Sequence, residues 1–384
     1  MKINSVAVIG SGFIGTVHIE AIRRTGNNVK GVMAGSAEST KNGVAKNKLA
    51  VGYQSVEDIC NDPEITVVHV TSPNALHFPQ VSQLISAGKH VICEKPLALS
   101  ASEGLELLRK ADAGNLVHAV CFNTRFYPMV HEGKSYVDSG KLGEVRYIKG
   151  HYHQDWLTLD TDWNWRLDSN EAGALRAIAD IGSHLIDQIG FVTGLKVQSV
   201  MSDLHTLVKV RQKPVGPVQT FTQDTSGNRE TVNMSSDDAA GVLVRYQSGA
   251  RGTISISQIS AGRKNSLNWE ISGSKSAIAF DSENPELLWI GHRGCPNEVM
   301  HKDPSTLSPN AASNAFYPGG HVEGFGETFR GLFEKVYSDI ETGERSGLYP
   351  TFAAGVESLQ ITDAIARSSV SQSWVEVRKQ EDRK

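Results

Sequence analysis

The sequence predicts an α/β domain with a buried parallel sheet, followed by an α+β domain whose sheet is antiparallel or mixed. Three observations support this prediction: short β-branched runs alternate with helical stretches over the first third of the chain, a glycine-rich turn follows the first run, and longer runs of alternating polarity appear beyond residue 123. A chain of 384 residues is also too long for one ordinary core. We place the two domains at residues 1–122 and 123–384.

The first domain is predicted from apolar runs that alternate with helices, which is typical of βαβ units around a parallel sheet. The predicted strands are residues 5–9, 29–33, 66–70, 90–93 and 117–121, and the predicted helices are residues 14–25, 37–47, 78–87 and 101–113. Each apolar run is short and bounded by turn residues, as expected of strands that are covered on both faces.

The second domain is predicted from longer strands with alternating polarity, which favour a sheet with one covered face. The predicted strands are residues 144–153, 196–210, 239–246, 252–260 and 268–280, the predicted helices are residues 173–193, 322–342 and 350–367, and a loop is predicted over residues 303–320. The last helix is assigned to the second domain, with packing back on the first domain as the alternative.

Composition excludes several classes of partner. The net charge of -4, from 38 basic and 42 acidic residues, gives no general attraction to nucleic acid or to an anionic membrane. The first apolar run is broken by Gly10 and Gly12, so we expect neither a signal peptide nor a membrane span. The four cysteines are scattered without a CxxC pair, which disfavours disulfides and a zinc ribbon and favours the cytoplasm.

The glycine-rich turn predicts a Rossmann dinucleotide site, because it follows a strand and opens a helix. Gly10 permits a tight turn, Gly12 lets the backbone approach a pyrophosphate, and Gly15 lets helix and strand pack closely. Phe13 and Ile14 complete the turn at the helix N-terminus, whose N–H groups face the phosphates. The alternative is a glycine-rich turn without a ligand.

The end of the second strand favours NADP over NAD. An acid normally binds the ribose 2′-hydroxyl there, but this chain has Ala34 and Gly35, and no carboxylate appears before Glu38. Ser36 is suited to donate to a 2′-phosphate, and Lys41 would add positive charge. The alternative is that Lys41 is only a solvated helix residue and that either cofactor binds.

Lys95 is the first candidate catalytic residue. It directly follows an apolar strand, and ligands of open parallel sheets bind at the carboxyl ends of the strands. A lysine at that place is suited to hydrogen-bond the reacting oxygen. A surface lysine is the alternative.

Asp180 and His184 are the second candidate pair. They are four residues apart, so on a helix they share one face. Histidine titrates near neutral pH and is suited to carry the proton that moves with a hydride. A helix-capping Asp with a core histidine remains an alternative, whereas the lack of a further ligand cluster disfavours a metal.

Four segments together resemble the glucose–fructose oxidoreductase, inositol dehydrogenase and rhizopine-catabolism family (Gfo/Idh/MocA). They are the glycine turn, Glu94-Lys95-Pro96, the run from Asn123 to Pro128, and the run from Asp180 to His184. The similarity runs over most of the chain. It implies a Rossmann domain followed by an α/β domain with an open, largely antiparallel sheet, which often forms the oligomer interface in this family.

The resemblance also implies roles for individual residues. Lys95 would contact nicotinamide and substrate, His184 would be the acid/base, and Asp180 would bind a substrate hydroxyl. Further cofactor contacts are expected at Thr71, Pro73, Asn74, His77, Glu94, Asn123, Trp165 and Arg166. Two departures are Ala34-Gly35 in place of the frequent acid, which puts NAD preference in doubt, and Thr124 in place of an aromatic residue, which is expected to matter little.

The substrate side is predicted from polar groups beside aromatic faces, which suit a carbohydrate or cyclitol. Trp156 and Trp163 lie in a short tryptophan-rich segment beside Gln154, and His321 ends the predicted loop. The expected substrate-binding residues are Lys95, Arg125, Trp156, Trp163, Asp180, His184 and His321. Core tryptophans and an exposed loop histidine are the alternatives.

The function expected from these residues is a dehydrogenase or reductase of a sugar, glycoside or inositol, using NAD(P) and favouring NADP. A glycosidase that oxidises C3 transiently, or a dinucleotide-binding sensor without chemistry, are the alternatives. The expected partners are a small polyhydroxylated molecule and further copies of the chain, in a homodimer or homotetramer.

Overall fold

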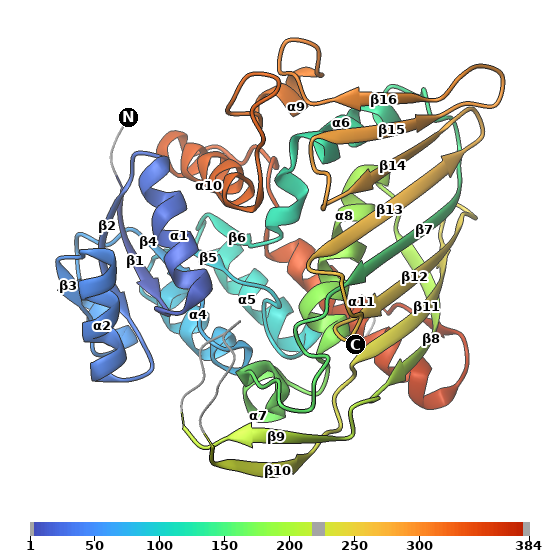
Figure 1. Cartoon of the computed structure of the whole chain (residues 1–384). Coiled ribbons are helices and arrows are strands. Elements are labelled where there is room, and N and C mark those ends of the chain that lie inside the picture. The colour runs from blue at the N-terminus through green and yellow to red at the C-terminus, as the bar shows by residue number, and fades with distance from the viewer. Residues whose placement is uncertain (1–3, 217–226, 379–384) are drawn as a thin grey trace. The chain divides into compact units, whose positions relative to one another are not determined.

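The computed structural model describes residues 4–216 and 227–378, whose elements are labelled in Figure 1. Their contacts divide the chain into two compact units. The first unit comprises the described residues up to Asn123 together with Asn170–Gly173 and Phe329–Leu359, and the second unit comprises the rest. The sequence-based division assigns 170–173 and 329–359 to the second domain, whereas they make their contacts in the first unit, where Phe333 packs against His18 and His69.

The first unit contains a six-stranded parallel sheet in the order β3-β2-β1-β4-β5-β6, which is the Rossmann arrangement (Figure 1). The strands are β1 (Ser5–Ile9), β2 (Asn28–Met33), β3 (Val51–Gly52), β4 (Val67–Val70), β5 (His90–Cys93) and β6 (His118–Val120). The strand order reverses between β1 and β4, and the loops that follow these two strands therefore flank the crevice where such sheets bind ligands.

Alternate residues of each strand face opposite sides of this sheet, and helices cover the side chains on both sides. The helices are α1 (Phe13–Arg24), α2 (Ala37–Asn47), α3 (Val56–Asn61), η1 (Asn74–Leu76), α4 (His77–Ser86) and α5 (Ala101–Ala113). Val68 and Val70 join the apolar core formed with α4 and α5, whereas His69, between them, bonds to His18 of α1. α5 starts in a capping box, in which Ser100 and Glu103 bond to each other's backbone N–H groups.

The second unit contains a nine-stranded mixed sheet in the order β16-β15-β14-β13-β7-β12-β11-β8-β17, of which Figure 1 labels the strands from β16 to β8. Its strands are β7 (Val145–His153), β8 (Val197–His205), β11 (Ala239–Tyr246), β12 (Arg251–Ser257), β13 (Ser266–Gly273), β14 (Ala277–Asp281), β15 (Leu287–Gly291), β16 (Glu298–His301) and β17 (Val375–Glu376). β7 and β12 are parallel, and the other neighbours are antiparallel.

Two predicted strands are wrong in length. The strand predicted over 268–280 is a hairpin of β13 and β14, because the chain turns at 274–276 and Gly273 N–H donates to the Ser276 carbonyl. The strand predicted over 196–210 ends at His205, and β9 (Val210–Pro214) pairs instead with β10 (Arg229–Asn233) in a separate two-stranded sheet. Polarity alternates on both sides of such turns, so the pattern alone does not mark them.

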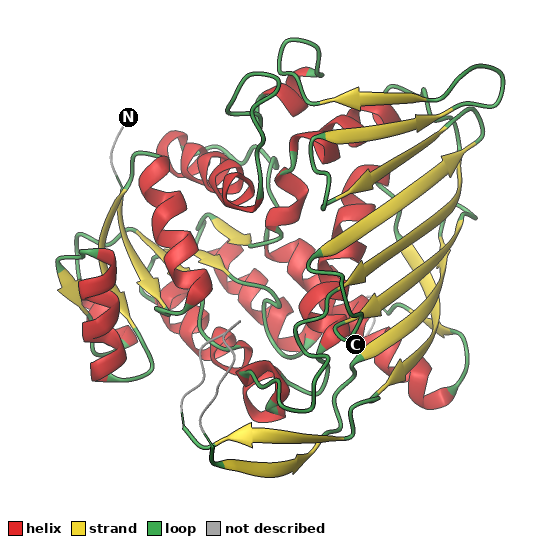
Figure 2. Ribbon diagram, viewed as in Figure 1, coloured by secondary structure: helices red, strands yellow, loops and turns green. Residues whose placement is uncertain are grey.

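One face of the nine-stranded sheet is covered and the other is open. α6 (Pro128–Asp138) and α8 (Ser183–Thr193) pack on β7, β13, β14 and β15 (Figure 2), around a core that includes the fully buried Trp269. Side chains that alternate with this core, such as Tyr147, Met201 and Leu243, are exposed. This confirms the predicted open, mostly antiparallel sheet.

The remaining elements are η2 (Asn123–Phe126), η3 (Trp165–Leu167), α7 (Ser169–Ala172), a π-helical turn (Ile178–Gly182), α9 (Pro309–Ala312), α10 (Phe325–Thr342) and α11 (Phe352–Ser371). The helix predicted over 173–193 thus begins only at Ile178 and opens with a π turn. The predicted loop 303–320 contains only the short α9. Among the described residues, no helix combines the length and the apolar character needed to cross a bilayer.

Candidate active site

The glycine turn of the first unit has the backbone shape that the sequence predicts. Gly10 has a φ of 108°, and a Cβ atom there would lie 2.4 Å from Thr71 Oγ1. A Cβ atom at Gly15 would lie 2.0 Å from the Gly10 carbonyl oxygen. Gly12 is the N-cap of α1 without a side-chain cap, and a Cβ atom there would meet nothing within 4 Å. The three glycines therefore leave room for a phosphate group next to the N–H groups at the N-terminus of α1.

Exposed apolar side chains follow three strands at the same edge of the sheet. Phe13, Leu76 and Leu99 are each between 45% and 46% exposed, and they follow β1, β4 and β5 respectively. Ile14, beside Phe13, is half-buried. Large apolar groups at the carboxyl ends of parallel strands are typical of a surface that a ligand covers. The turn and these side chains fit a dinucleotide.

The structure gives Ser36 a local role that the sequence does not reveal. Its hydroxyl oxygen accepts the Ser39 N–H at 3.1 Å and caps α2, while the hydroxyl group donates to Ser39 Oγ at 3.0 Å. Glu38 and Lys41 are exposed on the first turns of α2. The NADP preference stays a prediction, because these contacts leave both cofactors open.

The loop after β4 is tied to its neighbours through side chains predicted to line the cofactor. Thr71 Oγ1 donates to the Ile9 carbonyl at 2.8 Å and so joins the ends of β4 and β1. Pro73 is the N-cap of η1, and the buried Asn74 amide donates to the Ala172 carbonyl at 3.0 Å. These bonds fix the shape of the loop beside the glycine turn.

His77 positions a loop and has no surface for a cofactor. It is fully buried, and its ring nitrogens lie 2.7 Å from the Pro96 carbonyl oxygen and 2.9 Å from that of Ser72. Burial lowers the pKa of His77, against the opposing effect of these two carbonyls. We therefore correct the predicted cofactor contact of His77 to a positioning role on the loop that contains Lys95 and Pro96.

Lys95 is held through its backbone. Its N–H donates to Glu94 Oε2 at 3.2 Å, and Glu94 Oε1 lies 3.1 Å from His18 Nε2. The next residue, Pro96, is fixed by His77 as described. The Glu94 carboxylate is thus occupied by protein groups, which makes it a support for Lys95.

Arg125 is held in an ion pair with Asp187, and its predicted substrate contact stays a prediction. Its Nε donates to Asp187 Oδ2 at 2.6 Å in a two-pronged ion pair, and its guanidinium lies over the Phe191 ring. The guanidinium bonds to the Asp187 carboxylate through two of its nitrogens and lies against the Phe191 ring with one face, so it holds η2 against α8. Asn123, at the start of η2, is buried.

Thr124 lies beside His184 in the second unit. Its hydroxyl oxygen lies 3.5 Å from His184 Nδ1, and its carbonyl accepts the Gln188 amide N–H at 2.6 Å. Gln188 is fully buried and also accepts the Trp269 indole N–H at 2.6 Å. The residue that replaces the usual aromatic therefore lies beside the imidazole of His184, which is itself buried.

Asp180 lies in the π turn and His184 in the first turn of α8. π turns often occur at functional sites because they change which side chains a helix presents. Asp180 Oδ1 accepts from Arg166 Nε at 3.0 Å, and Oδ2 accepts from Gln258 Nε2 at 2.8 Å. The π turn thus changes the regular helical face that Asp180 and His184 were predicted to share. Asp180 is held by Arg166 and Gln258, whereas His184 lies beside Thr124.

Sequence reasoning missed the buried network that supports Asp180. Gln258 is fully buried and accepts from Arg176 Nη1 at 3.2 Å. Arg176 forms an ion pair with Asp238, which is also paired with Arg211 at 3.1 Å. Arg211 in turn donates to the carbonyls of 157 and 159 and so anchors the segment before Trp163. These residues lie on four separate segments, and no local pattern links them.

The tryptophan-rich segment presents aromatic and amide groups together. Trp156 donates to Gln154 Oε1 at 2.8 Å, and Gln154 and Tyr152 both donate to Asn265 Oδ1. The Tyr152 ring lies 6.5 Å from that of His184, and burial raises the pKa of Tyr152, which keeps its hydroxyl protonated. This arrangement is suited to bind hydroxyl groups.

Trp163 and Trp165 each have a cationic side chain positioned over the face of the indole ring. Lys213 Nζ lies 5.5 Å from the centre of the Trp163 ring, and the Arg166 guanidinium lies 4.5 Å from that of Trp165. Because Arg166 also binds Asp180, the Trp165-Arg166 pair is connected to the candidate catalytic residues of the second unit.

His321 is exposed, and its ring lies 3.3 Å from the Gly319 carbonyl. The loop before His321 is held by Lys302, whose side chain is fully buried. Its Nζ donates to a Glu323 carboxylate oxygen and to the His321 carbonyl, both at 2.7 Å. The loop is therefore fixed by a buried ion pair, although the substrate contact of His321 stays a prediction.

Comparisons with known proteins agree with this architecture. The model of an oxidoreductase family with an NAD-binding Rossmann fold matches residues 4–122, and the model of the GFO/IDH/MocA C-terminal domain matches residues 130–279.

Three relatives are similar to this chain. Levoglucosan dehydrogenase of Pseudarthrobacter phenanthrenivorans is 29% identical, over 97% of this chain and 98% of its own length. The structure of levoglucosan dehydrogenase in complex with NADH and L-sorbose is similar with a TM-score of 0.88 and 27% identity, over 99% of this chain and 100% of that one. The scyllo-inositol 2-dehydrogenase (NADP(+)) IolW of Bacillus subtilis is 33% identical over 36% of this chain and 38% of its own.

Proposed function

The chain belongs to the GFO/IDH/MocA family of oxidoreductases, and from that premise we propose that it is an NAD(P)-dependent dehydrogenase or reductase of a sugar or cyclitol. The observation that carries the proposal is the pair of Asp180, held at both oxygens, and His184, beside Thr124. Such a pair is suited to bind a hydroxyl group and to move its proton. The bound nicotinamide would supply hydride acceptance or donation at its C4 atom.

The protein groups divide the remaining work. In oxidation, His184 accepts the proton of the substrate hydroxyl, and the Lys95 ammonium donates a hydrogen bond to the same oxygen as it becomes a carbonyl. Asp180, whose two carboxylate oxygens are held by Arg166 and Gln258, accepts a hydrogen bond from a neighbouring hydroxyl. In reduction the same groups act in reverse.

We propose a polyhydroxylated ring as the substrate, with levoglucosan and related anhydro sugars tested first and inositols second. Support comes from the relative named levoglucosan dehydrogenase and from the bonded set of Trp156, Gln154, Asn265 and Tyr152. Amide groups bond to ring hydroxyls, and an indole face covers the apolar C–H patches of a sugar.

We propose NADP as the preferred cofactor. Ala34 and Gly35 follow β2 without a carboxylate, and Glu38 is the first acid on α2. Lys41 is exposed on the same helix, where its charge favours a 2′-phosphate. A relative named as an NADP-dependent inositol dehydrogenase supports this choice, and the relative crystallised with NADH is the competing case.

The experiment is the absorbance of reduced nicotinamide, followed with purified protein, each oxidised cofactor in turn, and a panel of anhydro sugars, pyranoses and inositols. We expect reduction of NADP with one ring substrate, and a fall in kcat of about 10²- to 10⁴-fold in Lys95→Ala and in His184→Ala. In Gly35→Asp we expect the preference to move toward NAD. Tight cofactor binding without turnover on any substrate would contradict the proposed reaction.

We also propose that copies of the chain associate through the open face of the nine-stranded sheet. Tyr147, Met201, Leu243 and Val299 are exposed there, between 37% and 53%, and an exposed apolar face favours a second copy. Light scattering should give a dimer or tetramer, and Leu243→Glu should lower that mass. A monomer at micromolar concentration would overturn this assembly.

Neither nucleic acid nor a membrane is proposed as a partner, given the net charge of -4. We propose the reducing cytoplasm as the compartment. Cys60, Cys93, Cys121 and Cys295 are all free thiols, which fits a reducing compartment.

A further inference from the structure

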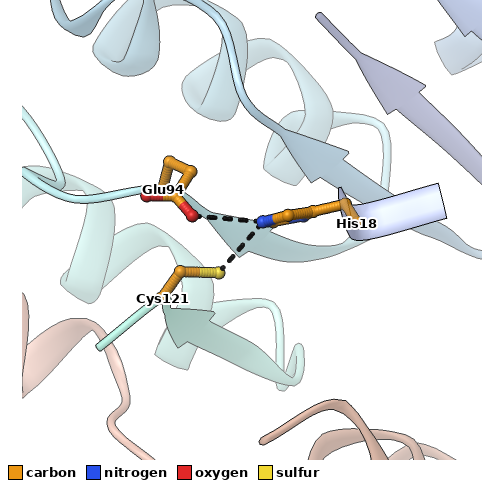
Figure 3. A group of neighbouring side chains, drawn as sticks. All are labelled: His18, Glu94 and Cys121. Carbon is orange, nitrogen blue, oxygen red and sulfur yellow. Dashed lines mark hydrogen bonds and ion pairs between the residues drawn. The ribbon is translucent and has the colours of Figure 1, made fainter. Parts of the chain in front are cut away.

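Four buried polar side chains of the first unit form a continuous row that the proposed reaction does not use directly. Tyr337 Oη, on α10, lies 2.8 Å from His69 Nε2, and His69 Nδ1, on β4, lies 2.9 Å from His18 Nδ1. His18 Nε2, on α1, lies 3.1 Å from Glu94 Oε1 (Figure 3). The row ends at the carboxylate that accepts the Lys95 N–H.

The surroundings of this row are apolar. The His18 ring is in contact with Phe329 and Phe333, at centre distances of 5.3 and 4.9 Å, and the His69 ring lies 4.6 Å from that of Phe333. Both histidines have no exposed surface. An unpaired polar group would be costly there, so every member must donate or accept in a compatible direction.

Donor and acceptor rules allow one consistent direction for uncharged rings beside an ionised carboxylate. Glu94 accepts only, so His18 carries its proton on Nε2 and presents a lone pair on Nδ1. His69 must then carry its proton on Nδ1, which leaves Nε2 to accept from the Tyr337 hydroxyl. Burial lowers the pKa of His69 well below its usual range and raises that of Tyr337, which favours the uncharged forms of both.

We propose that Tyr337, His69 and His18 form a buried hydrogen-bonded relay that donates, in that order, toward the Glu94 carboxylate, and that this relay positions the backbone of Lys95. The second half of the proposal rests on the proposed function, in which Lys95 bonds to the reacting oxygen. Tyr337, His69 and His18 are positioning residues, because they reach Lys95 only through Glu94.

A metal ion is the competing occupant of this place. His18, Glu94 and Cys121 each offer one ligand atom, all within 4.8 Å of one another, and Cys121 Sγ lies 3.8 Å from His18 Nε2 (Figure 3). Burial raises the pKa of Cys121 well above its usual range, and a thiol that keeps its proton is a poor metal ligand. A metal on His18 Nε2 would also displace the proton that the relay donates to Glu94.

The first test is nitrogen-15 NMR of the histidine rings in the full-length protein, without substrate. Tyr337→Phe, which keeps the aromatic ring, assigns the signals of His69, and Cys121→Ala assigns those of His18. We expect His69 protonated on Nδ1 and His18 on Nε2 near neutral pH. The reverse tautomers, a doubly protonated ring, or one equivalent of zinc in the purified protein would overturn the relay.

The second test separates positioning of Lys95 from simple stabilisation. Tyr337→Phe should lower kcat about three- to tenfold, with the KM values for substrate and cofactor within about twofold. The matched control is Tyr349→Phe, since Tyr349 is another buried tyrosine of the first unit, hydrogen-bonded to Asp339. It should lose stability without losing kcat.

Equal losses of kcat in the two variants, or no loss in Tyr337→Phe, would overturn the positioning role while the NMR result stands. If no substrate is turned over at all, the proposed function fails, and the NMR test still decides whether the relay exists.

Discussion

In the first unit, the loop that contains Lys95 is held by a hydrogen-bonded row of tyrosine and histidine side chains that leads to one carboxylate, whereas in the second unit Asp180 is held by amide and guanidinium groups backed by a buried ion pair. The first arrangement depends on which ring nitrogen carries a proton. The second depends on the balance of charge between Arg176, Arg211 and Asp238.

This difference predicts how strongly a polar substitution destabilises each unit. An uncharged relay loses one hydrogen bond when one member is changed, whereas a buried ion network is left with uncompensated charge. The two units should therefore differ most in how strongly a single polar substitution affects folding, and least at their exposed ion pairs.

The largest effect is expected at Asp238. In Asp238→Asn, Arg176 and Arg211 lose the buried carboxylate with which both are paired, so we expect a loss of about 3 to 5 kcal/mol in the free energy of unfolding. Urea denaturation measures it. The control is Asp138→Asn, which breaks an exposed pair with Lys134 and should cost under about 1 kcal/mol. A loss at Asp238 no larger than in the control would remove the contrast between the units.

The next effect is expected at the glycine turn of the first unit. In Gly15→Ala the new Cβ atom would meet the Gly10 carbonyl, so both stability and cofactor affinity should fall, the latter by about 30-fold or more. Gly12→Ala places its Cβ atom in open space and should keep the melting temperature while weakening cofactor binding about tenfold. Fluorescence titration and thermal unfolding measure the two effects. If Gly12→Ala binds cofactor normally, the assignment of this turn to the pyrophosphate is wrong.

A smaller effect is expected at Gln258, where the second unit holds Asp180. Gln258→Met keeps the volume but removes both the donor to Asp180 Oδ2 and the acceptor of Arg176 Nη1, and we expect kcat to fall about tenfold with unchanged cofactor affinity. Gln258→Glu should lose more, because it places a second carboxylate beside Asp180. Steady-state kinetics on the ring substrate that the absorbance assay identifies would test both. A Glu variant as active as the wild type would show that Asp180 does not depend on this support.

The smallest effect is expected at Asp62, in a partly exposed cluster of the first unit. Burial alone would raise the pKa of Asp62, but hydrogen bonds from Lys30, Tyr53 and the Glu64 N–H outweigh it and lower the pKa to about 2. A lowered folded-state pKa adds stability at neutral pH that disappears as the pH falls from about 4 toward 2. Asp62→Asn should thus cost under about 1 kcal/mol at pH 6, and less at pH 3. An equal cost at both pH values would contradict the lowered pKa.

Much of the first unit could be predicted because its signals are local. The helix at Ala37–Asn47 and the strand at His90–Cys93 have the predicted bounds, since short apolar runs and flanking turn residues mark their ends. The second unit was harder: the turn at 274–276 interrupts an alternation that continues on both sides, and β15 and β16 were not predicted.

The residues of the candidate site also differ in whether the sequence alone could locate them and identify their partners. Gly10, Gly15 and Lys95 could be located from their neighbours in the chain, because a strand–turn–helix fixes where they lie. Arg125 and His77 were given ligand contacts, yet folding places an Asp187 carboxylate and two backbone carbonyls against them. The partner of a polar side chain comes from another segment, so its identity is not written beside it.

The sequence by itself determined the order of the elements, the glycine turn and the residue types available for proton transfer, because backbone geometry and hydrophobic period act over a few neighbouring residues. Only the tertiary structure decided what each polar group bonds to. His18 meets His69 from 51 positions away, and His69 meets Tyr337 from 268. Burial then forces these groups to satisfy one another, since bulk solvent does not reach them to replace a missing partner.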